Sequence, residues 1–313
     1  MAELPPVVII AGPTASGKSA LALEAALRFD GEIINADSMQ VYRELSLLTA
    51  RPSEADQAAA PHHLYGFLPA EKPCSAGLWL ARATEKIQDV QGRKKLPIVC
   101  GGTGLYLKVL REGIAEIPDI PASVIADAEA LYDTLGGAEF LNRLSADDPA
   151  LAAKLLPSDR QRLVRAYSVA RATGTALSQW QERQPSRGPI NARFCNLLIM
   201  PERATLYDKI ETRFDQMLDM GALEEVRALS EMALDPSLPA MKALGVPELM
   251  GVLNGELKPE DAIAKAKQTT RNLAKRQMTW FRNQSKPDLV LNAFGSASLQ
   301  PGLQAIEDFL AER

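Results

Sequence analysis

The stretch Gly12-Pro13-Thr14-Ala15-Ser16-Gly17-Lys18-Ser19 matches the pattern G-x-x-x-x-G-K-[ST] of a nucleotide- or phosphate-binding loop, the P-loop. It lies between a β-branched run, Pro6–Ala11, and an Ala/Leu-rich helical segment, Ser19–Phe29, which is the context that this loop requires. Backbone N–H groups and the helix N-terminus would face a phosphate chain, Lys18 would reach its terminal oxygens, and the Ser19 hydroxyl would ligate Mg²⁺. The motif therefore predicts a polyphosphate site with Mg²⁺ but does not specify the polyphosphate. An accidental glycine-rich turn is the alternative.

Further short strands alternate with helical segments along the chain. Such alternation predicts an α/β fold, a P-loop parallel sheet flanked by helices. Helical periodicity covers 105–110, most of 123–180 and most of 205–281. The additional strands are expected at Glu32–Ala36, Pro97–Cys100, Cys195–Met200 and Asp288–Leu291.

The helical stretch 123–180 exceeds what is needed to cover this sheet, and it therefore predicts a second domain. Pro118 and Pro121 precede it, and Pro185–Pro189 follow it. We therefore expect a P-loop core of residues 1–118 and 191–313, which includes the C-terminal basic helices, and a smaller all-helical insertion domain of residues 119–190.

Composition excludes several classes of protein. The 313 residues are 46% hydrophobic and 24% charged, with a net charge of −4, as in ordinary globular proteins. Three separated cysteines and two adjacent histidines, His62 and His63, predict neither a disulfide framework, nor a zinc site, nor a Ser-His-Asp triad. No apolar run is long enough to cross a membrane, and the apolar run near the start lacks a basic leader. We expect a cytoplasmic protein that does not bind membranes.

Two further loops should meet the P-loop at the carboxyl edge of the sheet. Asp37 directly follows the second strand, and Gly101-Gly102-Thr103-Gly104 follows the third. Open α/β sheets bind ligands at this edge, so a carboxylate and a threonine hydroxyl would face the phosphate site. The alternatives are a helix N-cap for Asp37 and a tight strand-to-helix turn for the glycines.

Positive charge is concentrated in two segments of this acidic chain. Ala262–Pro287 contains seven basic residues and no acidic one, and Lys267, Arg271 and Lys275 share a helix face. Asp159–Arg165, within the expected insertion, carries three arginines. These patterns favour an anionic partner such as single-stranded nucleic acid. A solvated helix face, with Trp280 and Phe281 in the core, is the alternative for the first segment, and lid arginines of a kinase are the alternative for the second.

Six sequence blocks together resemble the bacterial tRNA dimethylallyltransferases, also called tRNA isopentenyltransferases. They occur in that family's order and extend over most of the chain, which makes the set more specific than any one block. The blocks are Gly12–Ser19, Asp37–Tyr42, Pro61–His63, Gly101–Tyr106, Gln161–Arg165 and Lys275–Arg282.

The resemblance implies transfer of a dimethylallyl group from dimethylallyl diphosphate to N6 of the adenosine immediately 3′ of the anticodon, in tRNAs that read codons beginning with U. It implies that Asp37 is the general base, that Thr103 lies near the adenosine and that Arg213 reaches the diphosphate. The residues are compatible with this chemistry: a carboxylate can take the N6 proton, and the P-loop with Mg²⁺ can stabilise the leaving diphosphate.

The resemblance also implies contacts with the tRNA anticodon stem-loop. The adenosine must be flipped out of its stack to react, and arginine and lysine contacts to the backbone predict salt-sensitive binding. We expect a monomer. The implied tRNA contacts are Asp37, Ser38, Met39, Gln40, Thr103, Gln161, Arg162, Leu163, Val164, Arg165, Lys242, Lys275, Arg276, Gln277, Met278, Thr279, Trp280, Phe281 and Arg282.

The sequence departs from the family pattern in two places. Leu48 replaces a usual glycine, which should reshape that turn. Gly245-Val246-Pro247 replaces a usual Gly-Tyr-Lys or Gly-Tyr-Arg, and so loses an aromatic ring and a cation near Lys242.

Three other functions remain open at this point. In a P-loop small-molecule or nucleotide kinase, Asp37 would bind an acceptor hydroxyl, but the basic stripe 265–282 would have no role. An adenylate isopentenyltransferase acting on free AMP would need neither that stripe nor the insertion. A non-catalytic RNA-binding module would not need the P-loop together with Asp37.

Overall fold

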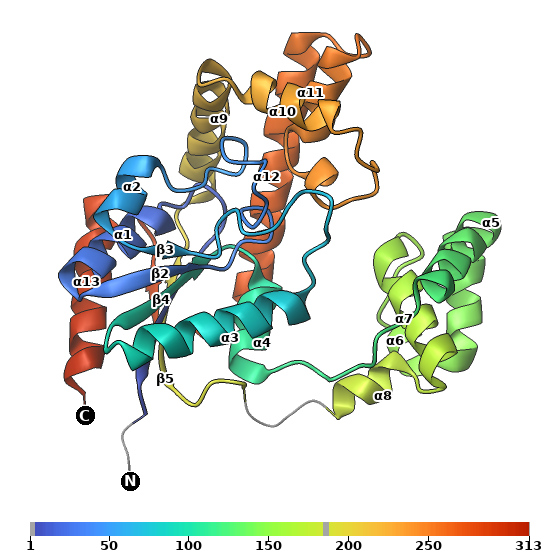
Figure 1. Cartoon of the computed structure of the whole chain (residues 1–313), viewed down its shortest axis with the longest axis horizontal. Helices are drawn as coiled ribbons and strands as arrows, with labels where there is room; N and C mark the ends of the chain where they lie inside the picture. Colours follow the sequence, from blue (N-terminus) through green and yellow to red (C-terminus); the bar gives the residue numbers. More distant parts are fainter. Residues whose placement is uncertain (1–3, 184–187, 313) are drawn as a thin grey trace. The chain divides into compact units, whose positions relative to one another are not determined.

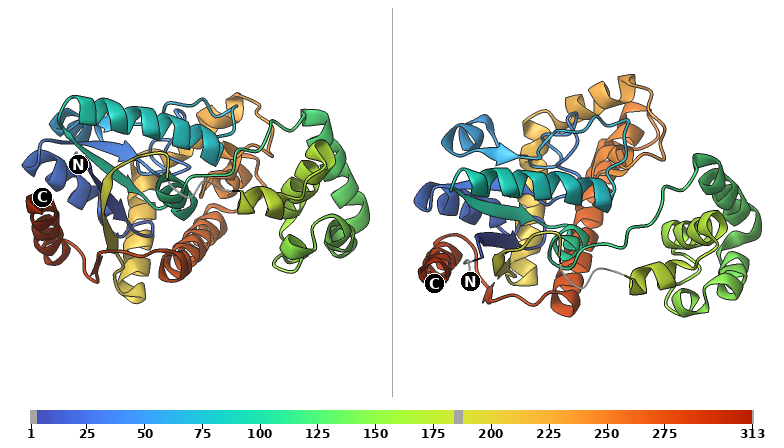
Figure 2. Two further views of the ribbon diagram at one scale, coloured as in Figure 1. Left: turned by 90° about the horizontal axis from the view of Figure 1, so that it is seen from below. Right: turned by 60° about the horizontal axis from the view of Figure 1, so that its bottom comes forward.

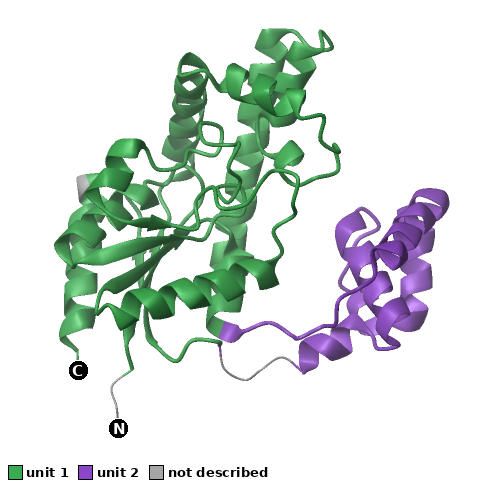
Figure 3. Ribbon diagram, in the orientation of Figure 1, with its two compact units in different colours: residues 1–111, 189–313 green, residues 112–188 purple. Residues whose placement is uncertain are grey.

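The computed structural model describes residues 4–183 and 188–312, so Pro185 lies outside the described residues. The chain forms two compact units, one of residues 1–111 and 189–313 and one of residues 112–188 (Figure 3). The second unit begins earlier than the expected insertion boundary at residue 119. The difference, residues 112–118, lies almost entirely in a segment without helix or strand, residues 113–121.

A six-stranded sheet forms the centre of the first unit (Figure 1). All five strand pairs are parallel, and the order β3-β2-β4-β1-β5-β6 places the P-loop strand β1 between β4 and β5. The predicted α/β parallel sheet is confirmed, and the short strand β3 was not predicted. The strands are β1 (Pro6–Ala11), β2 (Gly31–Asn35), β3 (His62–His63), β4 (Leu96–Gly101), β5 (Arg193–Ile199) and β6 (Leu289–Leu291).

Helices of the first unit cover both faces of this sheet (Figures 1 and 2). All the described helices of this unit are α1 (Lys18–Arg28), α2 (Glu54–Ala59), α3 (Ala76–Gly92), α4 (Gly104–Glu112), α9 (Arg203–Asp219), α10 (Ala222–Glu231), α11 (Val246–Leu253), α12 (Pro259–Gln284) and α13 (Ser296–Ala311), with a 3₁₀ turn at Ala240–Lys242.

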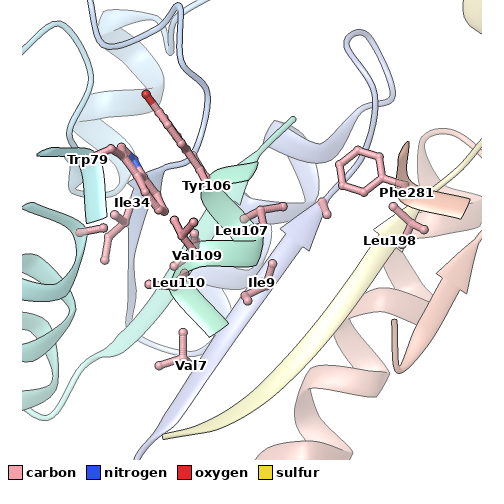
Figure 4. Close-up of a cluster of buried hydrophobic side chains, with 14 of the residues drawn as sticks. Val7, Ile9, Ile34, Trp79, Tyr106, Leu107, Val109, Leu110, Leu198 and Phe281 are labelled. Atoms are coloured by element: carbon pink, nitrogen blue, oxygen red, sulfur yellow. The ribbon is translucent and has the colours of Figure 1, made fainter. Parts of the chain in front are cut away.

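The alternation of side chains along β1 supplies two separate cores. Val8 and Ile10 pack with residues of α1 and α13 on one face. Val7 and Ile9 point to the other face and pack with residues of α3, α4, α9 and α12 (Figure 4). Because β1 is buried on both faces, its sequence is a continuous apolar run rather than an alternating one.

A third core lies among helices α9 to α12 of the first unit. It joins residues of the loop 39–50 to α9, α10, α11 and α12 and includes Leu48, Phe214 and Val246. The helical period expected over 205–281 is confirmed and is divided among these four helices.

The second unit contains helices and no strand among its described residues. They are α5 (Ala122–Asp147), α6 (Pro149–Ala152), α7 (Arg160–Thr173) and α8 (Leu177–Glu182), with a break in α5 at Gly136. Phe140, Leu144 and Leu163 are fully buried in its own core. Buried Asp148 accepts hydrogen bonds from the backbone N–H groups of Leu151 at 3.0 Å and Ser178 at 2.9 Å. It thereby links α6 to α8.

The cysteines and the apolar helices are where the sequence could have placed disulfides and membrane spans. Cys74, Cys100 and Cys195 are all free thiols. Burial raises the pKa of Cys100 to about 11, which suits a buried apolar residue and not a nucleophile. Among the described residues, no helix is long and apolar enough to cross a membrane.

Candidate active site

The P-loop connects the end of β1 to the first turn of α1. Ala15 and Gly17 adopt positive φ values of 62° and 88°, and this left-handed backbone turns successive N–H groups toward one side. Gly12 has no space for a side chain: a Cβ atom there would lie 2.6 Å from Ser16 Oγ and 2.7 Å from the Ile199 carbonyl oxygen. The loop therefore has the tight, partly left-handed backbone that a phosphate-binding loop needs, and phosphate binding stays a prediction.

One polar atom of this loop is buried without a partner. The Ser16 hydroxyl has no hydrogen-bond partner among the described residues, although Ser16 is fully buried. Buried hydroxyls almost always have a partner. An anion held by the loop would fit this unused donor.

Lys18 and Ser19 begin α1 directly after the loop. Lys18 Nζ donates to the Pro13 carbonyl oxygen at 3.3 Å, across the loop. Burial lowers the pKa of Lys18, the negative charge of Asp37 opposes this effect, and Arg213 adds to it. Ser19 is exposed, so its hydroxyl is accessible to a cation bound beside the loop.

Asp37 lies at the carboxyl end of β2 and is held by Asn35. Its backbone N–H donates to Asn35 Oδ1 at 2.8 Å, and Asn35 Nδ2 donates to its carbonyl oxygen at 3.0 Å. One carboxylate oxygen accepts from the Met39 N–H at 2.9 Å. Within the described chain, the second oxygen has no hydrogen-bond partner. No helix follows Asp37, so the alternative of a helix N-cap is wrong.

The glycine turn after β4 meets the Asp37 loop. The Thr103 N–H donates to the Ala36 carbonyl oxygen at 3.1 Å, and Thr103 Oγ1 accepts from the Ser38 N–H at 2.9 Å. A Cβ at Gly101 would collide with the backbone of Ala36. The turn is therefore both a tight strand-to-helix connection, as the alternative held, and a support for the loop that carries the carboxylate.

Arg213 reaches the P-loop from α9. Its guanidinium donates to Thr14 Oγ1 at 2.5 Å. Burial lowers the pKa of Arg213, and the charge of Asp37 opposes this shift. Glu211, two residues earlier on α9, pairs with Arg271 of α12 and not with Arg213.

Two half-buried cations, Lys18 and Arg213, thus lie near the carboxylate of Asp37 at the edge of the sheet. Desolvation lowers the pKa of both cations, and the negative charge of Asp37 opposes both shifts. Such a site stabilises a bound anion and leaves one carboxylate oxygen available to accept a proton. The described residues contain no group of three or more His, Cys, Asp or Glu side chains that could hold a metal ion by themselves.

Comparison with protein families identifies the class of this site. A model described as IPP transferase matches residues 40–284, and one described as isopentenyl transferase matches residues 5–63. The chain belongs to the IPP transferase family. As a family member it is an enzyme, a prenyltransferase that modifies tRNA. The expectations of a kinase and of a non-catalytic RNA-binding module are therefore wrong.

Relatives are similar in sequence to this IPP transferase over most of their length. The "tRNA dimethylallyltransferase" of Rhodospirillum centenum is 51% identical over 89% of both chains, and that of Parvibaculum lavamentivorans is 52% identical over 88% of both. A solved tRNA isopentenylpyrophosphate transferase from Staphylococcus epidermidis is 34% identical, covering 99% of this chain and all of that one, with a TM-score of 0.69. A eukaryotic dimethylallyltransferase solved acting on tRNA is 27% identical, covering 99% of this chain and 80% of that one, with a TM-score of 0.84.

The basic block on α12 divides into exposed and buried side chains in this IPP transferase. Lys275, Arg276, Thr279 and Arg282 are exposed, whereas Met278 and Phe281 are buried in the core beneath the helix (Figure 4). Trp280 is half-buried and packs against Gly104. The buried aromatic ring of Phe281 agrees with the core alternative, so side-chain contacts to a partner are restricted to the exposed residues of the block.

The helix-face stripe proposed from charge is only partly free. Lys267 Nζ pairs with Asp215 at 2.7 Å, and Arg271 pairs with Glu211, both on α9. These two cations connect α12 to α9. The expectation that Lys267 and Arg271 form, with Lys275, a surface free to bind an anionic partner is therefore wrong. Their acidic partners lie 52 and 60 residues earlier in the chain, so the local sequence pattern could not reveal them.

The basic block on α7 shows the same division. Gln161, Arg162 and Arg165 are exposed, whereas Leu163 and Val164 belong to the core of the second unit. Contacts by these two buried side chains would require that core to open. The block can offer a partner its three polar side chains.

The remaining predicted contacts lie in loops of the first unit. Ser38, Met39 and Gln40 are half-buried beside Asp37, and Gln40 Nε2 donates to the carbonyl oxygens of Thr49 at 2.9 Å and Ala50 at 2.8 Å. Lys242 is exposed at the end of the 3₁₀ turn.

The two departures from the family pattern lie close together. The Leu48 side chain packs beside Gly245, where a Cβ atom would lie 2.9 Å from it, and Val246 is buried in the same core. The Leu48 N–H donates to Glu225 at 3.0 Å. Leu48 and Val246 thus fill one shared apolar region.

Sequence reasoning missed the residues that hold Asp37 in place. Trp79 Nε1 donates to the Asn35 carbonyl oxygen at 2.8 Å, and its ring stacks on Tyr106 with centroids 4.4 Å apart (Figure 4). Asn35 is fully buried. The available signal was an asparagine directly after Ile33 and Ile34 at the end of a strand, where its amide needs buried partners.

Proposed function

We propose that this enzyme transfers the dimethylallyl group of dimethylallyl diphosphate to N6 of the adenosine immediately 3′ of the anticodon, in tRNAs that read codons beginning with U. The products are N6-isopentenyladenosine and diphosphate. Asp37 is the general base, and the enzyme acts as a monomer in the cytoplasm.

The observation that carries this proposal is the position of Asp37 among the charges of the site. Its free carboxylate oxygen can accept the N6 proton, and its charge acts on Lys18 and Arg213. The N6 lone pair is delocalised into the purine ring, so removal of the proton makes the nitrogen a better nucleophile toward the allylic carbon. The C–O bond breaks as the new N–C bond forms, and the departing diphosphate takes the bonding electrons.

The diphosphate is held by the P-loop from Gly12 to Ser19, with Lys18 and Arg213 as the charged contacts. The unpartnered Ser16 hydroxyl is a further donor. Thr103, which is bonded to the loop that carries Asp37, would contact the adenosine. Such donors lower the barrier because they stabilise charge that develops on the leaving group.

Mg²⁺ fits this site through one protein ligand. The exposed Ser19 hydroxyl would hold the ion, and diphosphate oxygens and water would complete its shell, which is the arrangement that Mg²⁺ prefers. The ion would neutralise part of the charge on the leaving diphosphate.

The tRNA contacts come from both compact units. Ser38, Met39 and Gln40 would line the entrance for the flipped adenosine. Lys242, the exposed residues of 275–282 and the polar residues of 161–165 would contact the anticodon stem-loop, mainly through its phosphates.

A transfer assay tests this function directly. Purified enzyme is incubated with Mg²⁺, dimethylallyl diphosphate and unmodified tRNA that reads codons beginning with U, and the digested nucleosides are weighed by mass spectrometry. A prenyl mass on the adenosine beside the anticodon is the expected result. AMP and a tRNA without adenosine at that position are the controls. Prenylation of AMP at an equal rate would instead assign the enzyme to free nucleotides.

The Asp37→Asn variant tests the general base. We expect transfer to fall by about 10²–10⁴-fold, the usual contribution of general-base catalysis, while tRNA affinity changes less than about threefold. A comparable loss of transfer and of tRNA affinity would contradict the general-base role.

A further inference from the structure

Gln277 connects the long helix α12 to the loop that follows β1 and to the loop that follows β4. Its Oε1 accepts a hydrogen bond from the Thr14 backbone N–H at 2.8 Å, and its Nε2 donates to the Gly102 carbonyl oxygen at 2.9 Å. These contacts join residues 263 and 175 positions apart in the chain. One carboxamide thus bridges the P-loop and the glycine turn.

The surrounding packing leaves this side chain little freedom. A Cβ atom at Gly102 would lie 2.5 Å from Gln277 Nε2, so a glycine is required for the contact. One turn further along α12, Trp280 packs on Gly104 of the same glycine turn. Gln277 itself is only partly exposed, whereas its neighbours Lys275 and Arg276 are exposed.

Thr14 is the point at which two helices meet the P-loop. Its backbone N–H is bound by Gln277 of α12, and its hydroxyl is bound by Arg213 of α9. Two ion pairs, Lys267–Asp215 and Arg271–Glu211, hold these helices together. The position of Arg213 over the loop therefore depends on where Gln277 holds Thr14.

We infer that Gln277 is a positioning residue of the diphosphate site, and that its carboxamide does not serve as a direct contact to tRNA. This inference rests on the proposed function. A glutamine suits the position because one amide offers the acceptor that Thr14 needs and the donor that Gly102 needs. Loss of the bridge leaves a partly buried N–H and a carbonyl oxygen unpaired and lets the loop move away from the geometry that binds diphosphate.

Three variants separate this role from its alternatives. Gln277→Met keeps the size of the side chain but removes both hydrogen bonds. Gln277→Glu keeps an acceptor, removes the donor and adds a negative charge beside the loop. Gln268→Met is the matched control, because Gln268 is exposed on the same helix and bonds only to its helix neighbours Asn272 and Arg271 in the described structure.

The measurements are the kcat and the KM for dimethylallyl diphosphate, the Kd for tRNA, the Kd for inorganic diphosphate with Mg²⁺, and the melting temperature. For Gln277→Met we expect diphosphate to bind about tenfold more weakly, the effect of about one lost hydrogen bond, and tRNA affinity to stay within about twofold. Gln277→Glu should bind diphosphate still more weakly because of its charge. Gln268→Met should match the unmodified enzyme.

Three results would overturn the inference. A loss of tRNA affinity with unchanged diphosphate binding would make Gln277 a direct tRNA contact. A lower melting temperature with unchanged diphosphate binding would make it only structural, and diphosphate binding by Gln277→Met equal to that of the unmodified enzyme would show that the bridge does not position the loop. Diphosphate binding is measured without prenyl transfer, so failure of the proposed reaction would leave this test intact.

Discussion

Thr103 Oγ1 accepts a hydrogen bond from the backbone N–H of Ser38 at 2.9 Å, and so joins the loop after β4 to the loop after β2. The Thr103 hydroxyl also donates to Ser38 Oγ, at 3.3 Å. Asp37, the proposed general base, is the residue immediately before Ser38. Thr103 therefore controls the position of Asp37 through the backbone, in addition to any contact with the adenosine.

Replacement of Thr103 by valine should reduce transfer. The variant keeps the shape of the side chain but leaves the Ser38 N–H unpaired, at a cost of about 1–3 kcal/mol. We expect kcat to fall at least tenfold, because a displaced base loses its alignment. Initial rates with both substrates measure this, and Thr103→Ser, which keeps the hydroxyl, should retain most of the activity. Equal rates for the valine and serine variants would exclude the hydrogen bond as the cause.

Replacement of Arg213 by glutamine should weaken diphosphate binding. Arg213 is a half-buried cation that contacts Thr14, and no carboxylate lies within ion-pair distance of it in the part of the chain that the structure describes. We expect the KM for dimethylallyl diphosphate to rise about 10–100-fold, from loss of a charged contact worth about 1.5–3 kcal/mol. Lys209→Gln, one helical turn earlier and exposed, is the control and should leave this KM unchanged. An equal increase in both variants would point to the net charge of α9 instead.

Cations of α12 should differ in their effect on tRNA binding. Arg276 is exposed, whereas Lys267 is paired with Asp215. Arg276→Gln should weaken tRNA binding and reduce the slope of log K against log salt by about one, because one phosphate contact is lost. Lys267→Gln should leave this slope unchanged, although both variants remove one positive charge. Filter binding over a range of salt concentrations distinguishes the two variants. Equal slopes would contradict the idea that the exposed Arg276 contacts a tRNA phosphate and the paired Lys267 does not.

Glu32 should make stability depend on pH at the acidic end. The buried carboxylate of Glu32 accepts a hydrogen bond from Arg93 Nη2 at 2.8 Å and is hydrogen-bonded to His63 Nε2 at 2.7 Å. The hydrogen bonds from Arg93, chiefly, lower the pKa of Glu32 from 4.5 to about 2 despite its burial, and His63 contributes. Because the folded pKa lies below the unfolded one, the stabilisation is complete above pH 4.5 and is lost as the pH falls toward 2.

The Glu32→Gln variant measures this contribution. We expect it to lower the free energy of unfolding by about 2 kcal/mol at pH 7, with a smaller difference from the unmodified protein at pH 3. Urea unfolding at both pH values gives the comparison, and Glu85→Gln, on the exposed face of α3, is the control. A difference that stays constant between the two pH values would contradict the ion-pair origin.

Local sequence was sufficient to predict the sheet, the P-loop and the position of Asp37. The β-branched run before Gly12 and the pattern ending in Lys18-Ser19 depend on residues adjacent in the chain, as do the strand and the acidic residue that follows it. These features follow from backbone preferences and side-chain periodicity, which act over a few residues. The strand β3 was missed because two histidines carry no strand periodicity and pair only with β2.

Local sequence could not predict which charges remain free or what each polar side chain contacts. Lys267 and Arg271 have the pattern of a basic surface, yet acidic residues of α9 pair with them. Gln277 lies within a basic block, yet its amide turns inward to Thr14 and Gly102.

The sequence by itself determined the fold class, the P-loop motif and the family resemblance, because each rests on short stretches of contiguous residues. Only the tertiary structure decided that Arg213 and Gln277 both bond Thr14 and that Thr103 bonds the Ser38 N–H. The physical reason is that hydrogen bonds and ion pairs depend on distance in space, and the parallel sheet brings together loops that lie far apart along the chain.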